Sequence, residues 1–282
     1  MNNNRKNFFV RTISGAVFVS IVIGSILLGA YFCAAMILAV IVLAMIEYYS
    51  IIDKYDVKTD KIAGVLCGVL IFCAGFLFAQ KTVSNRIFLI IIPLLVFIFI
   101  NQLYQKNTHS FRSIAYTVSG IIYVALPFTL LAGILFPSVE GNPEDRYMPD
   151  ILLGFFIFLW ANDTFAYLTG NAIGKHRLFE RISPKKSWEG FFGGLISTVA
   201  LSLLIAHLMP IISIFHWMAI AVITVVFGVF GDLVESLLKR NAGIKDSGNF
   251  LPGHGGILDR FDAALIAAPM VFLYLKAVVF TL

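Results

Sequence analysis

Acidic and basic residues crowd into the segment 232–262, where their spacing could build a catalytic or metal-binding site. Asp232, Glu235 and Lys239 are separated by three and four residues, so a helix would carry them on one face. Asp259 and Asp262 are three residues apart and would share a face where a further helix begins. Carboxylates from two helix ends could therefore converge, although a paired helix edge facing solvent would show the same spacing.

The connection between these helices, 241–256, contains five glycines and one proline, and we predict an irregular loop there. Glycine N–H groups can approach an anion closely, and carboxylates are the oxygen ligands that Mg²⁺ prefers beside substrate phosphates. Lysine and arginine side chains would neutralise the remaining phosphate charge. The segment thus predicts a site for a divalent metal and a polyphosphate. Its further charged or titratable residues are Arg240, Lys245, Asp246, His254 and Arg260.

A second group of polar residues lies upstream, between positions 162 and 190. Ser183 and Pro184 fit the cap and the first position of a helix, which would put Lys185 and Lys186 in its first turn. Two cations there oppose the helix dipole, and a bound anion would remove the conflict. Charges that only set membrane orientation, beside an ordinary cap, are the alternative. The residues that precede this segment are Asn162, Asp163, Tyr167 and Gly170, the last three on one helix face.

The elements that position these residues are predicted to be membrane-spanning helices. Of the 282 residues, 59% are hydrophobic and 13% are charged, about half the charged fraction of a soluble domain. An apolar run of about 20 residues spans a bilayer, and lipid forces such a run to be helical. We therefore predict an all-α, polytopic integral membrane protein with about nine transmembrane helices. The apolar segments are 12–30, 32–52, 62–80, 87–103, 113–136, 150–170, 190–209, 213–238 and 261–281.

The lysine and arginine positions predict how these spans are oriented. With nine spans, 17 of the 21 basic residues fall on the side of the N-terminus and of the loops 171–189 and 239–260. That side is predicted to be cytoplasmic, and both polar groups lie on it. The same topology accounts for the net charge of +5 without a nucleic-acid partner. The first residues are predicted to form an uncleaved anchor.

Two sets of residues within the spans are assigned no chemistry. Cys33, Cys67 and Cys73 lie in apolar runs, where a thiol behaves as a small hydrophobic group. Glu47 is near a span end, from which its carboxylate could simply reach the membrane interface.

The sequence resembles the phosphatidate cytidylyltransferase family (CDP-diacylglycerol synthases). The resemblance is densest from Ser236 to Asp262, in the run SLLKR…KDSG…LPGHGG…DRFD. The run ISPKKSWEG at 182–190 and the residues from Asn162 to Gly170 also look like blocks of that family. About 160–262 is covered closely, whereas the N-terminal half shares only its spanning character. We therefore divide the chain into N-terminal spanning helices, 1–136, and a membrane-embedded catalytic region, 137–282.

The resemblance implies a magnesium-dependent membrane enzyme of phospholipid biosynthesis. Such an enzyme transfers CMP from CTP to phosphatidic acid and releases CDP-diacylglycerol and pyrophosphate. It also implies a homodimer of nine-helix subunits, and it leaves open a second cation. An attacking phosphate is already anionic and needs no strong general base, but metal and cations must screen the two anions. We expect a bacterial inner (cytoplasmic) membrane, with the N-terminus and the active site cytoplasmic.

These implications give individual residues expected roles. Asp232 and Asp259 are expected to be the first metal ligands, because each lies at a helix end beside the loop. The supporting or second-metal ligands are Asp262 and Asp246. The cations that hold phosphates are Lys239, Arg240, Lys245 and Arg260. The expected catalytic set is Asp246, Lys239, Arg260 and His254, and the remaining substrate-binding residues are Ser183, Lys185, Lys186, Asn162 and Asp163.

Three other kinds of protein fit parts of this pattern. A CTP-dependent polyprenol or phytol kinase would also need Mg²⁺, CTP and a lipid, but its acceptor would be an alcohol. A transporter would spread polar residues through the middle of the bilayer, whereas here they gather at one surface. A non-catalytic membrane scaffold would not need the glycine-rich loop with its aspartates and lysines.

Overall fold

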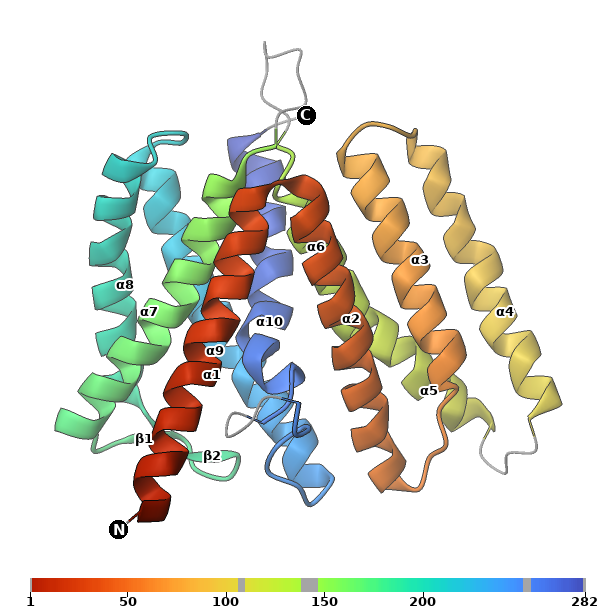
Figure 1. Ribbon diagram of the computed structural model, residues 1–282, viewed down its shortest axis with the longest axis horizontal. Helices are drawn as coiled ribbons and strands as arrows, with labels where there is room; N and C mark the ends of the chain where they lie inside the picture. Colours follow the sequence, from red (N-terminus) through yellow and green to blue (C-terminus); the bar gives the residue numbers. More distant parts are fainter. Residues whose placement is uncertain (1, 106–109, 138–146, 251–254, 281–282) are drawn as a thin grey trace.

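The computed structural model describes residues 2–105, 110–137, 147–250 and 255–280, and over these residues the protein is nearly all-α (Figure 1). The α-helices are α1 (Asn2–Leu28), α2 (Ala30–Ile52), α3 (Lys61–Ala79), α4 (Ile91–Tyr104), α5 (Ser110–Gly120), α6 (Leu126–Gly133), α7 (Pro149–Ile173), α8 (Trp188–Leu208), α9 (Ile214–Asn241) and α10 (Leu258–Tyr274). The short helical segments are η1 (Asp53–Tyr55), η2 (Asn85–Ile90), η3 (Ile121–Ala125) and η4 (Leu275–Val279). Strands β1 (Arg177–Phe179) and β2 (Ser183–Ser187) form one antiparallel hairpin.

The predicted membrane spans are confirmed. Eight helical stretches among the described residues are long and apolar enough to cross a bilayer, and the apolar helix Thr12–Leu28 adds a shorter one. Helices α5 and α6 make one span, because the π-helical segment η3 joins them without a break. Pro127 lies just beyond this segment and has no N–H to give to an α-helical hydrogen bond, which explains the local change of helix type.

The connections between spans lie at two ends of the bundle. Gly29 turns the chain from α1 into α2 with a φ of 121°, which a residue with a side chain rarely adopts. This turn and the C-terminus lie at one end, whereas the N-terminus, the β1–β2 hairpin and the α9–α10 connection lie at the other (Figure 1). The two predicted polar groups therefore share one end of the molecule, as expected. That this end faces the cytoplasm stays a prediction.

Helices α7, α8 and α9 pack against one another, α10 packs against α9, and these helices together with the β1–β2 hairpin carry both polar groups. Gly231 lets the backbones of α9 and α10 touch. A Cβ at this position would lie 3.0 Å from the Cα of Ala263 and would clash with the carbonyl oxygen of Asp262. Residues that flank this contact on α9 and α10 are therefore held close together.

Aromatic packing fixes the first turn of α10. Phe261 is buried, and its ring makes edge-to-face contacts with Phe18 of α1 at 5.4 Å, Phe128 of α6 at 5.4 Å and Phe156 of α7 at 6.1 Å between centroids. Such contacts contribute about 0.5–1.5 kcal/mol each beyond the burial of area. Because these contacts hold Phe261 in place, they also fix the start of α10, which carries Asp259 and Asp262. The hydrophobic core includes residues on both sides of position 136, and the division of the chain there stays a prediction.

The predicted helix start at Ser183 and Pro184 is wrong. These residues belong to strand β2, in which Ser183 pairs with Phe179. Helix α8 begins five residues later at Trp188. Its cap is Ser187, whose hydroxyl accepts a hydrogen bond from the N–H of Gly190 at 3.1 Å. Both Ser183 and Ser187 pair with β1, and Ser187 is the cap because it is the last residue of β2, directly before α8.

Candidate active site

Three carboxylates meet between α9 and α10. Asp232 and Glu235 of α9 and Asp262 of α10 each offer an oxygen, and these oxygens lie within 4.8 Å of one another. The backbone contact at Gly231 brings the two helices near enough for this arrangement. We call these three residues the carboxylate cluster. Among the described residues, it is the group of acidic, histidine or cysteine side chains whose spacing could hold a metal ion.

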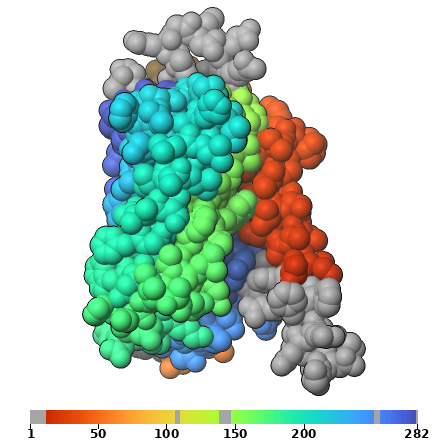
Figure 2. Space-filling model, turned by 90° about the vertical axis from the view of Figure 1, so that its left-hand side faces the viewer, coloured from red at the N-terminus to blue at the C-terminus, as the bar shows by residue number. Residues whose placement is uncertain are grey.

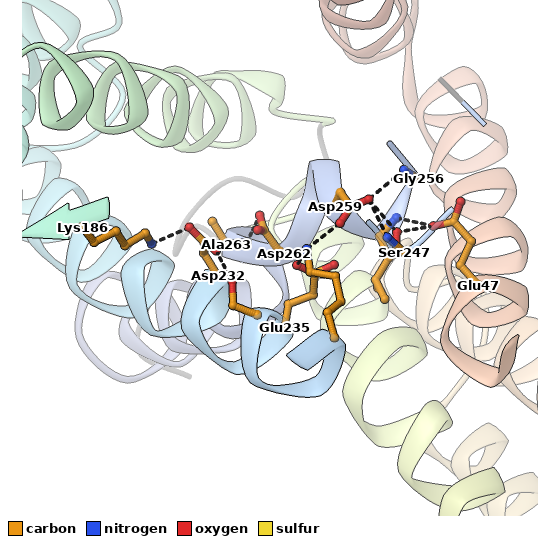
Figure 3. A network of polar contacts seen from close by, with 12 residues as sticks. Glu47, Lys186, Asp232, Glu235, Ser247, Gly256, Asp259, Asp262 and Ala263 are labelled. Carbon is orange, nitrogen blue, oxygen red and sulfur yellow. Dashed lines mark hydrogen bonds and ion pairs between the residues drawn. The ribbon is translucent and has the colours of Figure 1, made fainter. Parts of the chain in front are cut away.

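Two lysines neutralise part of the negative charge of the carboxylate cluster (Figure 3). Lys186 of β2 forms an ion pair with Asp232. Lys239 lies one turn beyond Glu235 on α9 and forms an ion pair with it. Glu235 is fully buried at 0% exposure, and its oxygens have no hydrogen-bond donor among the described residues apart from that ion pair. A buried carboxylate with free lone pairs is a costly arrangement unless a further positive charge joins it.

Asp259 has a different environment from the carboxylate cluster. Its Oδ1 receives the ammonium group of Lys239 at 2.6 Å. Its Oδ2 accepts hydrogen bonds from the N–H of Gly256 at 2.8 Å, and from the N–H and the hydroxyl of Ser247, both at 2.9 Å. The side chain therefore ties the α9–α10 connection to Lys239, and its oxygens are already well supplied with donors.

The structure brings together only some of the expected metal ligands, and which residues bind a metal stays a prediction. The structure brings Asp232 and Asp262 together as expected, but the third carboxylate is Glu235 and not Asp259. The spacing of 232 and 235 already puts their side chains on one helix face, so the signal for Glu235 was present in the sequence. Asp259 was placed at the same helix end correctly, but its hydrogen-bond partners depend on how the loop folds back.

Glu47 of α2 is the most distant part of the site in sequence. Its carboxylate accepts hydrogen bonds from the N–H of Ile257 at 2.9 Å, the N–H of Leu258 at 2.8 Å and the hydroxyl of Ser247 at 3.0 Å. The interpretation that Glu47 reaches the membrane interface is therefore wrong, because the side chain caps the N-terminus of α10. No local pattern in the sequence could connect residues about 200 positions apart.

A cavity of about 700 Å³ lies beside the carboxylate cluster, and we call it the large cavity. The helix faces of α7 and α9 and the β1–β2 hairpin line it, so it contains residues from both predicted polar groups. Of the predicted site residues, Asn162, Asp163, Lys185, Lys186 and Asp232 line this cavity. Arg177 of β1 also lines it and was not predicted.

The hairpin, and not a helix turn, presents the two lysines to the large cavity. Lys185 is exposed, whereas Lys186 is half-buried and reaches Asp232. Ser183 pairs with Phe179 in the hairpin and is not part of the cavity lining. Because Lys185 and Lys186 lie on a strand, no helix dipole opposes their charge, and that reason for expecting a bound anion is not valid. The prediction that the two lysines bind an anion now depends on their position at the large cavity.

A second cavity, of about 170 Å³, reaches the carboxylate cluster from the side of α1, and we call it the small cavity. Ser14, Gly15, Phe18 and Val19 of α1 and Trp160 of α7 form its wall, and Asp163, Asp259, Arg260 and Asp262 supply the polar lining. Figure 2 shows α7 and α8 covering one face of the molecule, with α1 at its margin. Asp163 lines both cavities, so it lies between the two approaches to the cluster.

The remaining predicted residues lie on the loop between α9 and α10 or at its edges. Arg240, Lys245 and Asp246 are exposed, and so is Arg260 at the start of α10. His254 lies outside the described residues. The structure therefore brings Arg260 to the small cavity, whereas it places Arg240, Lys245 and Asp246 at the surface.

Tyr123 was not predicted and comes close to the carboxylate cluster from the π-helical segment η3. Its hydroxyl is buried and has no hydrogen-bond partner among the described residues. The charges of Glu235, Asp262 and Asp232 act on it. Short π-helical segments inside α-helices are frequent at functional sites, but the only sequence signal for this one is Pro127.

Comparison with known proteins gives this site a context. The profile described as the cytidylyltransferase family matches residues 9–278, which is nearly the whole chain. Proteins named phosphatidate cytidylyltransferase are similar over a shorter stretch. That of Staphylococcus epidermidis is 38% identical over 169 residues, that of Staphylococcus saprophyticus 40% over 168, and that of Staphylococcus aureus 38% over 168. The matched stretch is 59% of this chain and spans 61% of the length of each of these relatives.

Proposed function

This chain belongs to the cytidylyltransferase family, and from that premise we propose that it transfers CMP from CTP to phosphatidic acid. A phosphate oxygen of phosphatidic acid forms a bond to the α-phosphorus of CTP, and the bond from that phosphorus to the pyrophosphate oxygen breaks. The products are CDP-diacylglycerol and pyrophosphate. The names of the Staphylococcus relatives support this pair of substrates, and the apolar helices support a lipid as one of them.

The observation that carries the proposal is the position of the large cavity between the carboxylate cluster and three cations. Its volume of about 700 Å³ is within the usual range for small-molecule sites. Arg177, Lys185 and Lys186 line it and would bind the phosphates of CTP. Asn162, whose buried Oδ1 accepts no hydrogen bond among the described residues, would accept one from the nucleotide. A polyphosphate bound there would lie beside Asp232.

We further propose that the carboxylate cluster binds Mg²⁺ through Asp232, Glu235 and Asp262. The chemistry of these donors fits the ion, because oxygen ligands are what Mg²⁺ selects. The buried oxygens of Glu235 lack a hydrogen-bond donor beyond the Lys239 ion pair, as expected of a side chain that awaits a cation. When bound, the ion would lower the charge on the triphosphate and stabilise the leaving pyrophosphate.

The chain's own residues would meet the other demands of the reaction. The nucleophile is an anionic phosphate, so the site needs cations that bring two anions together and needs no strong base. Arg260 in the small cavity would bind the phosphate of phosphatidic acid, and α1 would border its acyl chains. The two substrates would then approach Asp163 and the carboxylate cluster from two sides. Asp246 as a supporting or second-metal ligand, Arg240 and Lys245 as phosphate-binding cations, and His254 as a catalytic residue stay predictions.

The test is a radiolabel experiment on the purified protein in detergent with phosphatidic acid, Mg²⁺ and CTP. CTP labelled at its α-phosphate should leave its label in the lipid, with release of pyrophosphate. CTP labelled at its γ-phosphate should leave none there. Label from the γ-phosphate in a lipid alcohol would identify a CTP-dependent lipid kinase instead, and transfer of neither label would reject the proposal.

The placement in the cell is proposed on the same basis. The chain is an integral membrane protein, and we propose that its N-terminus and active site face the cytoplasm across a bacterial cytoplasmic membrane. The excess of lysine and arginine at that end supports the orientation. Labelling of cysteines introduced at each end of the bundle would test it. The homodimer stays a prediction, which the mass of the purified protein in detergent would test.

A further inference from the structure

We propose that Glu47 is a positioning residue for the metal site, although it belongs to α2 and lies far from the carboxylate cluster in sequence. The inference rests on the proposed function of that cluster as a metal site. Glu47 would act through Ser247, Asp259 and Lys239, which connect it to Glu235 in one continuous polar network (Figure 3).

The first step of the network is the grip of Glu47 on the start of α10. Its Oε1 accepts the N–H of Ile257 at 2.9 Å, and its Oε2 accepts the N–H of Leu258 at 2.8 Å. These N–H groups belong to the unsatisfied donors of a helix N-terminus, where a carboxylate is favoured by both hydrogen bonding and the helix dipole. The grip fixes the turn that is followed by Asp259 and Asp262.

The second step is the hydroxyl of Ser247, which lies between two carboxylates. It is 3.0 Å from Oε2 of Glu47 and 2.9 Å from Oδ2 of Asp259. A serine hydroxyl has one proton, so the two acceptors share it. Any movement of Glu47 therefore changes the hydrogen bonding of Asp259 directly.

The third step leads from Asp259 into the carboxylate cluster. The ammonium group of Lys239 is 2.6 Å from Oδ1 of Asp259 and is also ion-paired with Glu235. The side chains of Lys239, Asp259 and Glu235 are 12%, 7% and 0% exposed, so water screens these charges little. Asp259 thus holds the cation that orients the buried cluster carboxylate.

The loop is shaped to let Glu47 come this close. A Cβ at Gly248 would lie 2.6 Å from Oε1 of Glu47, and one at Gly256 would clash with both Oε2 of Glu47 and the hydroxyl of Ser247. Two glycines therefore lie directly on this carboxylate. A residue that only capped the N-terminus of α10 would not need Gly248 and Gly256 to lie against its carboxylate as well.

The chain offers a matched control in Asp60, which also caps a helix with a carboxylate. Its Oδ1 accepts the N–H of Ala63 at the start of α3 at 3.0 Å, and its Oδ2 accepts the amides of Asn101 and Gln105. Asp60 belongs to the same N-terminal half as Glu47 but has no described contact with the carboxylate cluster. It therefore separates the effect of losing a helix cap from the effect of losing the network.

The experiment compares Glu47→Gln, Ser247→Ala, their combination and Asp60→Asn in the full-length protein in detergent. Glutamine replaces one carboxylate oxygen with an NH2 donor, so the N–H of Ile257 or of Leu258 would face a donor in place of its acceptor. Mn²⁺ binding, followed by its paramagnetic resonance signal, serves as a readout that needs no turnover. Outer partners of metal ligands typically change metal affinity or activity about 10- to 100-fold. We expect Mn²⁺ binding about tenfold weaker in Glu47→Gln and Ser247→Ala, and no weaker in the combination than in Glu47→Gln.

The outcomes decide between the alternatives. Asp60→Asn should lower the melting temperature and bind Mn²⁺ like the unchanged protein. Equal loss of melting temperature in Glu47→Gln and Asp60→Asn, with normal Mn²⁺ binding in both, would show a helix cap alone and overturn the proposal. If Glu47→Gln does not fold, normal Mn²⁺ binding by Ser247→Ala would overturn the proposal. Failure of the unsubstituted protein to bind Mn²⁺ would also overturn it. If the expected Mn²⁺ pattern appears but no CMP is transferred, the proposed function fails and the role of Glu47 stands.

Discussion

Replacing Gly231 with alanine should disable the site, although it removes no functional group. The new Cβ would lie 3.0 Å from the Cα of Ala263 and still closer to the carbonyl oxygen of Asp262. Carbon atoms pack best at about 3.5–4.0 Å, so the backbones of α9 and α10 would have to separate by about 0.5–1 Å. That movement draws Asp262 away from Asp232 and Glu235, which lie on the other helix.

The expected magnitude follows from this displacement. Overpacking of this kind costs about 1–3 kcal/mol of folding free energy, and a misplacement of about 1 Å at a catalytic site can lower the rate about 100-fold. The assay measures CMP transfer and Mn²⁺ binding in the purified variant. Gly24→Ala is the control, because a Cβ there meets no atom within 4 Å. Normal turnover and Mn²⁺ binding in Gly231→Ala would refute the view that contact between these helices assembles the site.

Other variants test single parts of the site. Glu235→Gln removes a buried charge from the carboxylate cluster and should weaken Mn²⁺ binding about 10- to 100-fold, which an unchanged titration would contradict. Asp259→Ala should abolish CMP transfer while the protein still inserts into membranes, since Lys239 and the loop lose their common partner; turnover at the normal rate would exclude Asp259 from the site. Lys185→Ala should raise the KM for CTP about tenfold, and an unchanged KM would leave this lysine only a topological role.

The sequence predicts the fold class well because hydrocarbon leaves a long apolar run little choice of structure. The turn at Gly29 and the spans from α2 to α10 follow from apolar length and from the residues that interrupt it. Asp232, Glu235 and Lys239 could be placed on one face, because helix periodicity is a local property. The common location of the two polar groups also followed, since the charge pattern along the chain assigns both loops to one side.

What the sequence could not predict depends on contacts between distant segments. The helix start predicted at Ser183 lies too early, because residues 183–187 pair with β1 as strand β2 and α8 begins only after Ser187. Glu47 finds its partners through the packing of α2 beside the α9–α10 connection. Asp259 and Glu235 differ in environment because the fold of the loop supplies hydrogen-bond donors to Asp259 and not to Glu235.

The contact of Glu47 with α10 has a consequence for biogenesis. A nascent chain synthesised only as far as α9 carries Asp232 and Glu235 into the membrane, but it lacks Asp262 and the turn that Glu47 grips. Such insertion intermediates would therefore lack one carboxylate of the proposed metal site and could not carry out the proposed CMP transfer. The complete site would form in a single late step of biogenesis, when the N-terminus of α10 docks against Glu47 of α2.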